Sequence, residues 1–334
     1  MLDQQEKLWD YEAVQPGQAG QPTVVLITAE NIAEYALLSQ NRDVRYQEGS
    51  GHQEYDHEPV AMPTMVLSYA PLLRDDIAEN NGFVAQEQSR TARRQTPFAK
   101  CEIRWFRLVR AGDTITATRR VLEKYQRRGS KFVTFRIEAA NQHGEKVAEY
   151  DYTCIFEYAR GQRQPPRESD APKPNSSKSS SEAPVQVSPR LLTFNTVSIG
   201  DQLAILTISE SQEIINRKNE FRLAVKPSPS NIHTDEEFAR QNIFGGTVNS
   251  GPATMSYVDQ MLEQSFPLRS FYSGGKLLMR AITPFRSGDT VAFGGEVTNK
   301  SEESGKKIVE CRVKGINQRG ELVCLSDATM VMPD

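Results

Sequence analysis

Two stretches of the chain decide its fold: AGDTITATRRVLEKYQRRGSKFVTFRIEAANQHGEKVAEYDYT (residues 111–153) and SGDTVAFGGEVTNKSEESGKKIVECRVKGINQRGELVCLSDAT (residues 287–329). Both open with Gly-Asp-Thr after one small residue, and both contain Asn-Gln, one variable residue and Gly-Glu. Gly112 and Gly288 are 176 residues apart (288 − 112), and the two Asn-Gln pairs have the same offset (317 − 141). A constant offset without a gap indicates an internal duplication.

Each copy has the pattern of an antiparallel meander. In KFVTFRIEA (residues 131–139) the side chains alternate between two faces. One face holds Phe132, Thr134, Arg136 and Glu138, and the other holds Val133, Phe135 and Ile137. The turn sequences NQHG and NQRG contain residues that tolerate positive φ at a hairpin. Each copy is therefore predicted to be a set of long strands joined by tight turns.

A helix is expected upstream of each meander, at residues 63–80 and 251–266. Both segments are too apolar for a surface helix, so each should be wrapped by its antiparallel sheet. Residues 160–190 are rich in proline, serine and charge, and they are predicted to be a flexible tether. The predicted fold class is α+β, with one helix-in-sheet half at residues 1–159 and the other at residues 191–334.

Composition limits the possible functions. The chain has 334 residues, 38% of them hydrophobic, with a net charge of −3 and a pI near 6.0. There is no global positive field for nucleic acid, which is therefore not an expected partner. The first residues lack a basic stretch followed by an apolar one, and no run of about 18 apolar residues occurs. A cytoplasmic protein that does not enter the membrane is expected.

The sequence gives no strong sign of a metal site. The four cysteines, without zinc-ligand spacing, are expected to be buried free thiols: Cys101, Cys154, Cys311 and Cys324. His52, Asp56 and His57 lie close together, but no second cluster completes a coordination shell, so a polar loop is the expectation. No metal and no cofactor are expected.

SPSNIHTDEEFARQNIFGG (residues 228–246) contains one of only four histidines. His233 follows a turn-like run and precedes an acidic segment that predicts a helix start. Imidazole titrates near neutral pH, so His233 could act as a general acid or base. Alternatively, it could simply cap the helix, which Thr234, Asp235 and Glu236 could also begin without it.

The duplicated meander, the two buried helices and the sequence NIHTDEEFA together resemble the double hot-dog members of the MaoC-like hydratase and dehydratase family. The resemblance covers nearly the whole chain outside the tether. It implies a double hot-dog fold and an acyl-thioester substrate, carried on coenzyme A or an acyl carrier protein. In that family an Asp and a His of the motif DxNPIH activate water, and a backbone N–H of a glycine loop binds the thioester carbonyl.

Carried over residue by residue, the motif is only partly present. His233 and the aliphatic Ile232 match it, whereas Ser228 stands at the position of the catalytic Asp. A serine hydroxyl has no useful basicity at pH 7 and could only orient water or the imidazole. Gly251 keeps the glycine whose N–H would face the carbonyl. The resemblance thus implies His233, Ser228 and Gly251 as the catalytic group.

Further residues are expected near the substrate. Asn249 and Ser250 belong to the loop before the second helix, and Ser250 stands where the family usually has a histidine. Asp235 is the nearest carboxylate in sequence, although a first-turn helix acid is its ordinary role. In the first half, Tyr46 stands at the histidine position, so that half is expected to be non-catalytic and to shape the acyl tunnel.

The expected function is hydration or dehydration of an acyl thioester. A thioesterase, or a changed lyase or cyclase, remains an alternative on the same scaffold, because a fold does not fix chemistry. A non-catalytic acyl-binding or assembly subunit is the alternative from another class. Arginine-rich runs at residues 90–94, 119–120 and 127–128 are expected to be solvated; alternatively, one of them could bind the phosphates of coenzyme A or the acidic face of a carrier protein. A homodimer of the chain is possible.

Overall fold

The computed structural model describes residues 6–47, 49–159, 190–225 and 230–333. The tether predicted at residues 160–190 lies, apart from Arg190, outside the described residues, and so does Ser228. Among the described residues, no helix has the length and apolar character needed to cross a bilayer.

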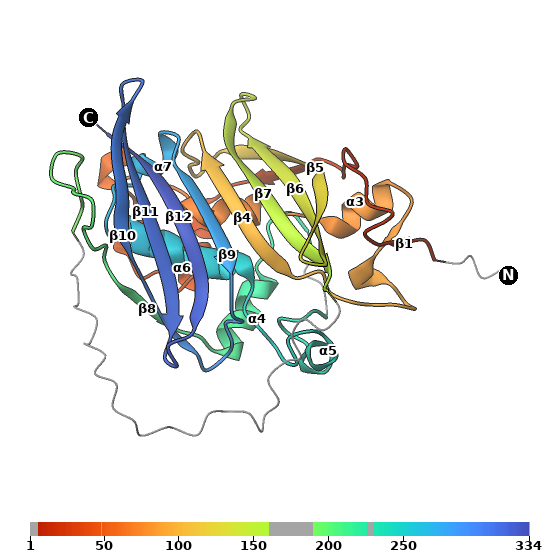
Figure 1. Cartoon of the computed structure of the whole chain (residues 1–334). Helices are drawn as coiled ribbons and strands as arrows, with labels where there is room; N and C mark the ends of the chain where they lie inside the picture. The colour runs from red at the N-terminus through yellow and green to blue at the C-terminus, as the bar shows by residue number, and fades with distance from the viewer. Residues whose placement is uncertain (1–5, 48, 160–189, 226–229, 334) are drawn as a thin grey trace, which may run out of the picture.

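One ten-stranded sheet runs through both halves, in the order β2-β5-β6-β7-β4-β9-β12-β11-β10-β8 (Figure 1). The first half supplies β2 (Thr23–Leu26), β4 (Phe98–Trp105), β5 (Thr114–Arg127), β6 (Ser130–Ala140) and β7 (Lys146–Glu157). The second supplies β8 (Leu206–Ser209), β9 (Lys276–Ala281), β10 (Thr290–Glu303), β11 (Lys306–Asn317) and β12 (Leu322–Met332). The halves join where β4 pairs antiparallel with β9.

The internal duplication is visible in the sheet. The strand order on one side of the β4–β9 junction mirrors the order on the other. Gly112 and Gly288, which open the two meanders, have φ values of +96° and +83°, a conformation that suits glycine. In the first hairpin the N–H of Asn141 donates to Glu145 O at 3.0 Å, and in the second that of Asn317 donates to Glu321 O at 3.0 Å. The same sequence therefore builds the same turns twice.

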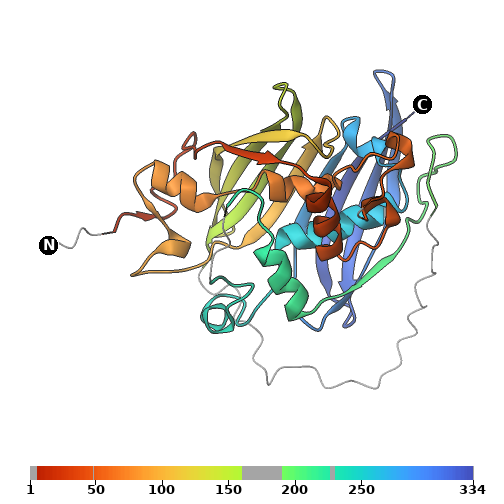
Figure 2. The same ribbon diagram turned by 180° about the vertical axis from the view of Figure 1, so that it is seen from behind.

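Helices cover one face of the sheet (Figure 2). The longest, α6 (Gly251–Glu263), is buried from Ala253 onward, as predicted for the second half. The others are α1 (Ala29–Leu38), α4 (Gln212–Glu220), α5 (Glu236–Gln241) and α7 (Arg269–Tyr272), with the short 3-10 helices η1 (Val44–Tyr46), η2 (Gln53–Tyr55) and η4 (Gln86–Gln88). A separate parallel pair joins β1 (Leu8–Trp9) and β3 (Val84–Ala85).

The helix predicted at residues 63–80 is not continuous, and that prediction was wrong. The segment forms η3 (Pro63–Met65), α2 (Val66–Tyr69) and α3 (Arg74–Asn80). Pro71 explains the break, because proline disfavours helical backbone in the residue before it and donates no hydrogen bond. Ala70, the preceding residue, has φ −128° and ψ 63°. The broken helix places Pro71 and the residues after it beside the second half.

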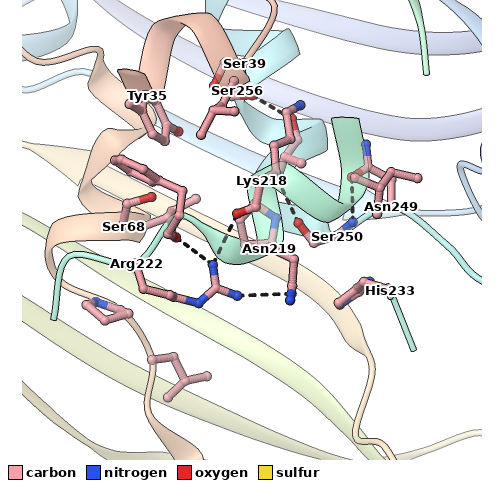
Figure 3. Close-up of a pocket in the computed structure, with 18 of the residues that line it drawn as sticks. Tyr35, Ser39, Ser68, Lys218, Asn219, Arg222, His233, Asn249, Ser250 and Ser256 are labelled. Carbon is pink, nitrogen blue, oxygen red and sulfur yellow. Dashed lines mark hydrogen bonds between the residues drawn. The ribbon is translucent and has the colours of Figure 1, made fainter. Parts of the chain in front are cut away.

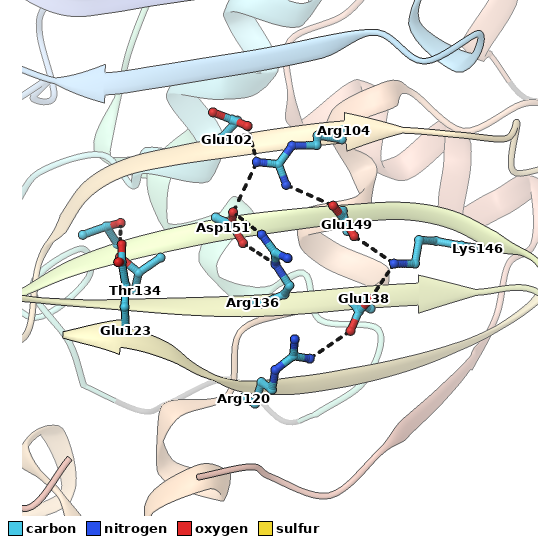
Figure 4. A network of polar contacts seen from close by, with 11 residues as sticks. Glu102, Arg104, Arg120, Glu123, Thr134, Arg136, Glu138, Lys146, Glu149 and Asp151 are labelled. Atoms are coloured by element: carbon cyan, nitrogen blue, oxygen red, sulfur yellow. Dashed lines mark hydrogen bonds and ion pairs between the residues drawn. The ribbon is translucent and has the colours of Figure 1, made fainter. Parts of the chain in front are cut away.

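The two faces of the sheet have opposite chemistry. Val133, Phe135 and Ile137, which the alternation places on one face, are fully buried. The opposite face carries a network of ion pairs across β4 to β7 (Figure 4), in which Arg136 binds Asp151 at 2.7 Å. These charges are thus paired with one another on the solvent side of the sheet.

Arg119 contradicts the prediction of solvated arginine runs. It is 2% exposed, since it follows Ile115 and Ala117 on the inward face of β5. Its guanidinium donates to Thr23 Oγ1 at 2.6 Å and to the carbonyl of Pro71 at 3.2 Å. Oxygens of β2 and of the segment at the helix break thus satisfy the buried cation.

All four cysteines are free and buried, as predicted. The described part of the chain contains no group of three or more His, Cys, Asp or Glu arranged to hold a metal.

Candidate functional site

A pocket of about 230 Å³ lies between the two halves (Figure 3). The first half contributes residues from three places. They are Tyr35, Leu38 and Ser39 at the end of α1, then Leu67, Ser68, Pro71, Leu72, Leu73 and Arg74 around the helix break, and Tyr150 and Tyr152 of β7. The second half contributes Ile215, Lys218 and Asn219 from α4, then Phe221, Arg222, Val225 and His233, and finally Asn249, Ser250, Pro252, Ala253 and Ser256 at the start of α6. A cavity between two packed halves is a common place for a ligand.

His233 is a pocket residue and not a helix cap. Its Nδ1 lies 2.8 Å from the carbonyl oxygen of Val248. A carbonyl oxygen can only accept a hydrogen bond, so Nδ1 is the ring nitrogen that carries the hydrogen. Burial lowers the pKa of His233 to about 4, outweighing the bond to Val248, which raises it. The imidazole is therefore neutral at pH 7, and its Nε2 is left with a free lone pair.

Neighbouring groups hold the His233 segment in place. The N–H of His233 donates to Asn231 Oδ1 at 2.8 Å. Asp235 is the residue that caps α5, because its side chain accepts from the N–H of Phe238 at 3.0 Å. From the first half, Arg93 donates to the carbonyl of Ser230 at 2.8 Å and stacks on Phe238, with its guanidinium carbon 4.0 Å from the ring centroid. Both halves thus fix the position of the imidazole.

Asn249 and Ser250 line the pocket beside His233, but their side chains are engaged in structure. Asn249 donates to Glu210 Oε2 at 2.5 Å and accepts from the N–H of Ser250 at 2.9 Å. Ser250 caps α6 by accepting from the N–H of Ala253 at 3.2 Å. These bonds hold the first turn of α6 against the pocket.

Gly251 is the first residue of α6, and both its neighbours, Ser250 and Pro252, line the pocket. Among the described residues, no acceptor binds its N–H. Free N–H groups at a helix start attract a negatively charged oxygen. A side chain does not fit here, because a Cβ would lie 2.4 Å from Cγ of Phe98. The glycine is therefore required by packing.

Two residues expected near a substrate lie outside the pocket lining. Tyr46 is 2% exposed and donates from its hydroxyl to Glu263 Oε2 at 2.7 Å. Asp235 is committed to its helix cap and to Ser230. Their side chains are thus directed toward internal partners.

Three cationic residues of the pocket were missed from the sequence: Arg74, Lys218 and Arg222. Lys218 lies in the last turn of α4, and Arg222 follows two residues after that helix ends at Glu220. Their closeness in sequence was the available signal, but it could not show that both side chains meet a pocket.

Tyr46 belongs to a buried polar cluster with Asp259 and Glu263 of α6. Asp259 Oδ2 accepts from the N–H of Thr64 at 2.9 Å and from its hydroxyl at 2.6 Å. Arg45 pairs with Glu263 at 3.3 Å. The other oxygens of both carboxyls, Oδ1 of Asp259 and Oε1 of Glu263, are buried without a partner. Two carboxyls in this setting favour their neutral forms.

We expect Glu263→Gln to remove a pH dependence of folding stability. Burial, and then the charge of Asp259, raise the pKa of Glu263 well above its ordinary value. The stability from a raised native pKa is complete below the unfolded pKa of about 4.3 and is lost as pH rises through the native pKa. Because glutamine stays neutral, the unfolding free energy of the variant, measured in urea, should improve relative to the native protein from about pH 5 to about pH 8.

The exposed Glu302→Gln is the matched control for this measurement. A difference between Glu263→Gln and the native protein that stayed constant with pH would contradict the assigned protonation.

Comparisons with known proteins agree with this architecture. Residues 221–318 match the family model of the MaoC like domain, and residues 15–150 match that of the FAS1-like dehydratase domain region. A comparison with curated protein sequences gave no match.

Three solved structures share the fold. A MaoC-like dehydratase has a TM-score of 0.66 at 16% identity, covering 95% of this chain and 99% of its own. A MaoC-like dehydratase from Phytophthora capsici has a TM-score of 0.61 at 15% identity, covering 95% and 96%. A Mycobacterium tuberculosis protein described as a double hotdog fold has a TM-score of 0.57 at 12% identity, covering 97% and 98%.

At such low identity the structural likeness establishes the fold alone, and it confirms the predicted double hot-dog. The two family models match different halves of the fold. The chain is thus a double hot-dog whose second half resembles the MaoC like domain and whose first half resembles the FAS1-like dehydratase domain region.

Proposed function

We propose that the protein is a hydro-lyase that adds water to an enoyl thioester or removes it from a 3-hydroxyacyl thioester. The observation that carries the proposal is His233, a neutral imidazole at the pocket whose Nδ1–H is held by Val248. A fixed tautomer with a free Nε2 is suited to taking a proton from water and returning it.

In the hydration direction, Nε2 of His233 takes a proton from water while the water oxygen bonds to C3 of the enoyl group. The C2–C3 π electrons move toward the carbonyl, and the resulting enolate oxygen accepts a hydrogen bond from the Gly251 N–H. The imidazolium then returns its proton to C2. One base therefore serves both steps, which matters because no carboxylate lines the described part of the pocket.

The first half is proposed to be non-catalytic, so that each chain has one active site. In support, Tyr46 replaces the histidine and its hydroxyl is bound to Glu263. The first half still matters to the site, because α1, the helix break and β7 form one wall of the pocket.

The proposal is tested by following the enoyl-thioester absorbance with crotonyl-CoA and, in reverse, with 3-hydroxybutyryl-CoA; the same acyl groups on a carrier protein identify the carrier. Release of free thiol without loss of the enoyl band would instead indicate a thioesterase. Binding of both thioesters with no change in either would indicate an acyl-binding subunit.

Restoring the family carboxylate is expected to increase hydration. Ser228 corresponds in sequence to the catalytic Asp, so Ser228→Asp should raise the rate of crotonyl-CoA hydration by supplying a second base. Ser228→Asn is the control, because asparagine has nearly the shape of aspartate without its charge. If Ser228→Asn raised the hydration rate as much as Ser228→Asp, or if Ser228→Asp alone lowered it, the result would indicate a site rebuilt for other chemistry.

A further inference from the structure

The pocket has an unusual charge composition. Arg74, Lys218 and Arg222 line it, and no carboxylate does so among the described residues. Figure 3 shows Lys218, Arg222 and His233 around the same space. Lys218 comes from the last turn of α4 and Arg222 from just beyond that helix, whereas Arg74 comes from the first half.

The cations are not fully compensated. Arg74 pairs with Glu87 at 3.0 Å, but its Nε is buried without a partner. Lys218 donates to the Tyr257 hydroxyl, and its one carboxylate partner among the described residues is Glu210, at 4.0 Å. That carboxylate oxygen already accepts from the Tyr257 hydroxyl at 2.6 Å.

Arg222 has no carboxylate partner in the described structure. It donates only to neutral oxygens, those of Phe221 at 2.8 Å, of the Asn219 side chain at 3.1 Å and of the Lys218 carbonyl at 3.3 Å. Three cations thus face two carboxylates, and the pocket keeps an excess of positive charge.

Burial makes this excess costly. The ammonium of Lys218 lies 3.9 Å from the centroid of the Tyr257 ring, and its side chain is 10% exposed. Burial lowers the pKa of Lys218 to about 7, with Glu210 only partly opposing it. An alkyl chain beside these groups would displace water and leave their N–H groups without hydrogen-bond partners. A carboxylate would instead accept charge-assisted hydrogen bonds from them.

The size of the pocket limits the acyl group. Its volume of about 230 Å³ is below the roughly 300–1,000 Å³ typical of sites for drug-sized ligands. Ser39, Ser68 and Ser256 add polar groups to the lining. A short and polar acyl group fits this lining better than a long fatty chain.

We propose that the substrate is a short acyl thioester whose acyl chain ends in a carboxylate, bound by Lys218 and Arg222. The ligand is thus the monothioester of a dicarboxylic acid. This inference rests on the proposed function only for the thioester, and it does not depend on which reaction follows.

The test is calorimetric binding of two unreactive ligands, succinyl-CoA and 4-methylpentanoyl-CoA. In the second, two methyl groups replace the two carboxylate oxygens, so the shape and the coenzyme A phosphates are shared. We expect succinyl-CoA to bind about 10- to 100-fold more tightly, as hydrogen bonds to charged groups allow. Lys218→Met should remove most of this preference and leave 4-methylpentanoyl-CoA binding no weaker.

Lys314→Met, at an exposed position of β11, is the matched control and should keep the preference. Arg222→Met provides a second variant at an exposed position, should Lys218→Met fail to fold. Equal affinity for the two ligands, or a preference for 4-methylpentanoyl-CoA, would contradict the proposal that the acyl chain ends in a carboxylate. The assignment of a thioester substrate would still hold. If neither ligand bound, the thioester assignment would fail, and this inference with it.

Discussion

His233→Ala is expected to lower the turnover of the enoyl thioester by about 100-fold or more, the usual effect of losing a general acid or base. The imidazole is neutral at pH 7, with Nδ1–H held by Val248 and Nε2 free, whereas Lys218, whose pKa is lowered to about 7, stays partly protonated. Folding should survive, because Asp235, and not His233, caps α5. Turnover is measured per folded molecule, after thermal unfolding has confirmed the native state.

His143→Ala, at the exposed first hairpin, is the control and should retain full activity. The pH profile gives a second readout. Because the pKa of His233 is lowered to about 4, the imidazole stays neutral and basic above that pH. As pH is lowered, kcat/KM should therefore decrease with a midpoint near pH 4, the pKa of His233 in the free enzyme. The residual activity of His233→Ala should not show this decrease. Full turnover in that variant would exclude His233 from the mechanism and favour an acyl-binding protein.

Removal of the Gly251 N–H is expected to lower kcat by about 100- to 1,000-fold, the effect of losing one oxyanion donor. A direct substitution would also create a clash, because a Cβ at this position would lie 2.4 Å from Phe98 Cγ. The comparison therefore uses Phe98→Ala as its background. In it, Gly251→Pro removes the N–H, whereas Gly251→Ala keeps it.

Proline suits the first position of a helix, so both double variants should form α6. Gly251→Ala without the Phe98 change should lose about 1–3 kcal/mol of stability from overpacking, and the Phe98→Ala background should restore part of it. Equal kcat in the two double variants would show that Gly251 serves packing only.

Much of the candidate site could be anticipated from its motif. His233, Asn249 and Ser250 were predicted from sequence, and the structure brings their side chains to one pocket. Tyr46 was expected near a substrate but lies in a buried cluster with Glu263. Nothing local indicates this pairing, because the two residues are far apart in the chain and meet only when the halves pack.

Two other predictions conflict with local rules. Pro71 inside the apolar run at residues 63–80 favours a break, although the hydrophobic pattern on both sides of it favours a continuous helix. Arg119 shares the two-residue period of Ile115 and Ala117, which points it inward. A charged residue faces solvent by default and is buried only where partners satisfy its hydrogens, as the oxygens of Thr23 and Pro71 do for Arg119.

The sequence by itself determined the duplicated meanders, their glycine turns, the buried helix of the second half and the position of His233. These features depend on periodicity and turn chemistry, which act over a few neighbouring residues. Only the tertiary structure decided which polar groups share the pocket, and with which protonation. Lys218 and His233 owe their lowered pKa values first to burial. Burial depends on segments brought together from both halves, a property that no local pattern contains.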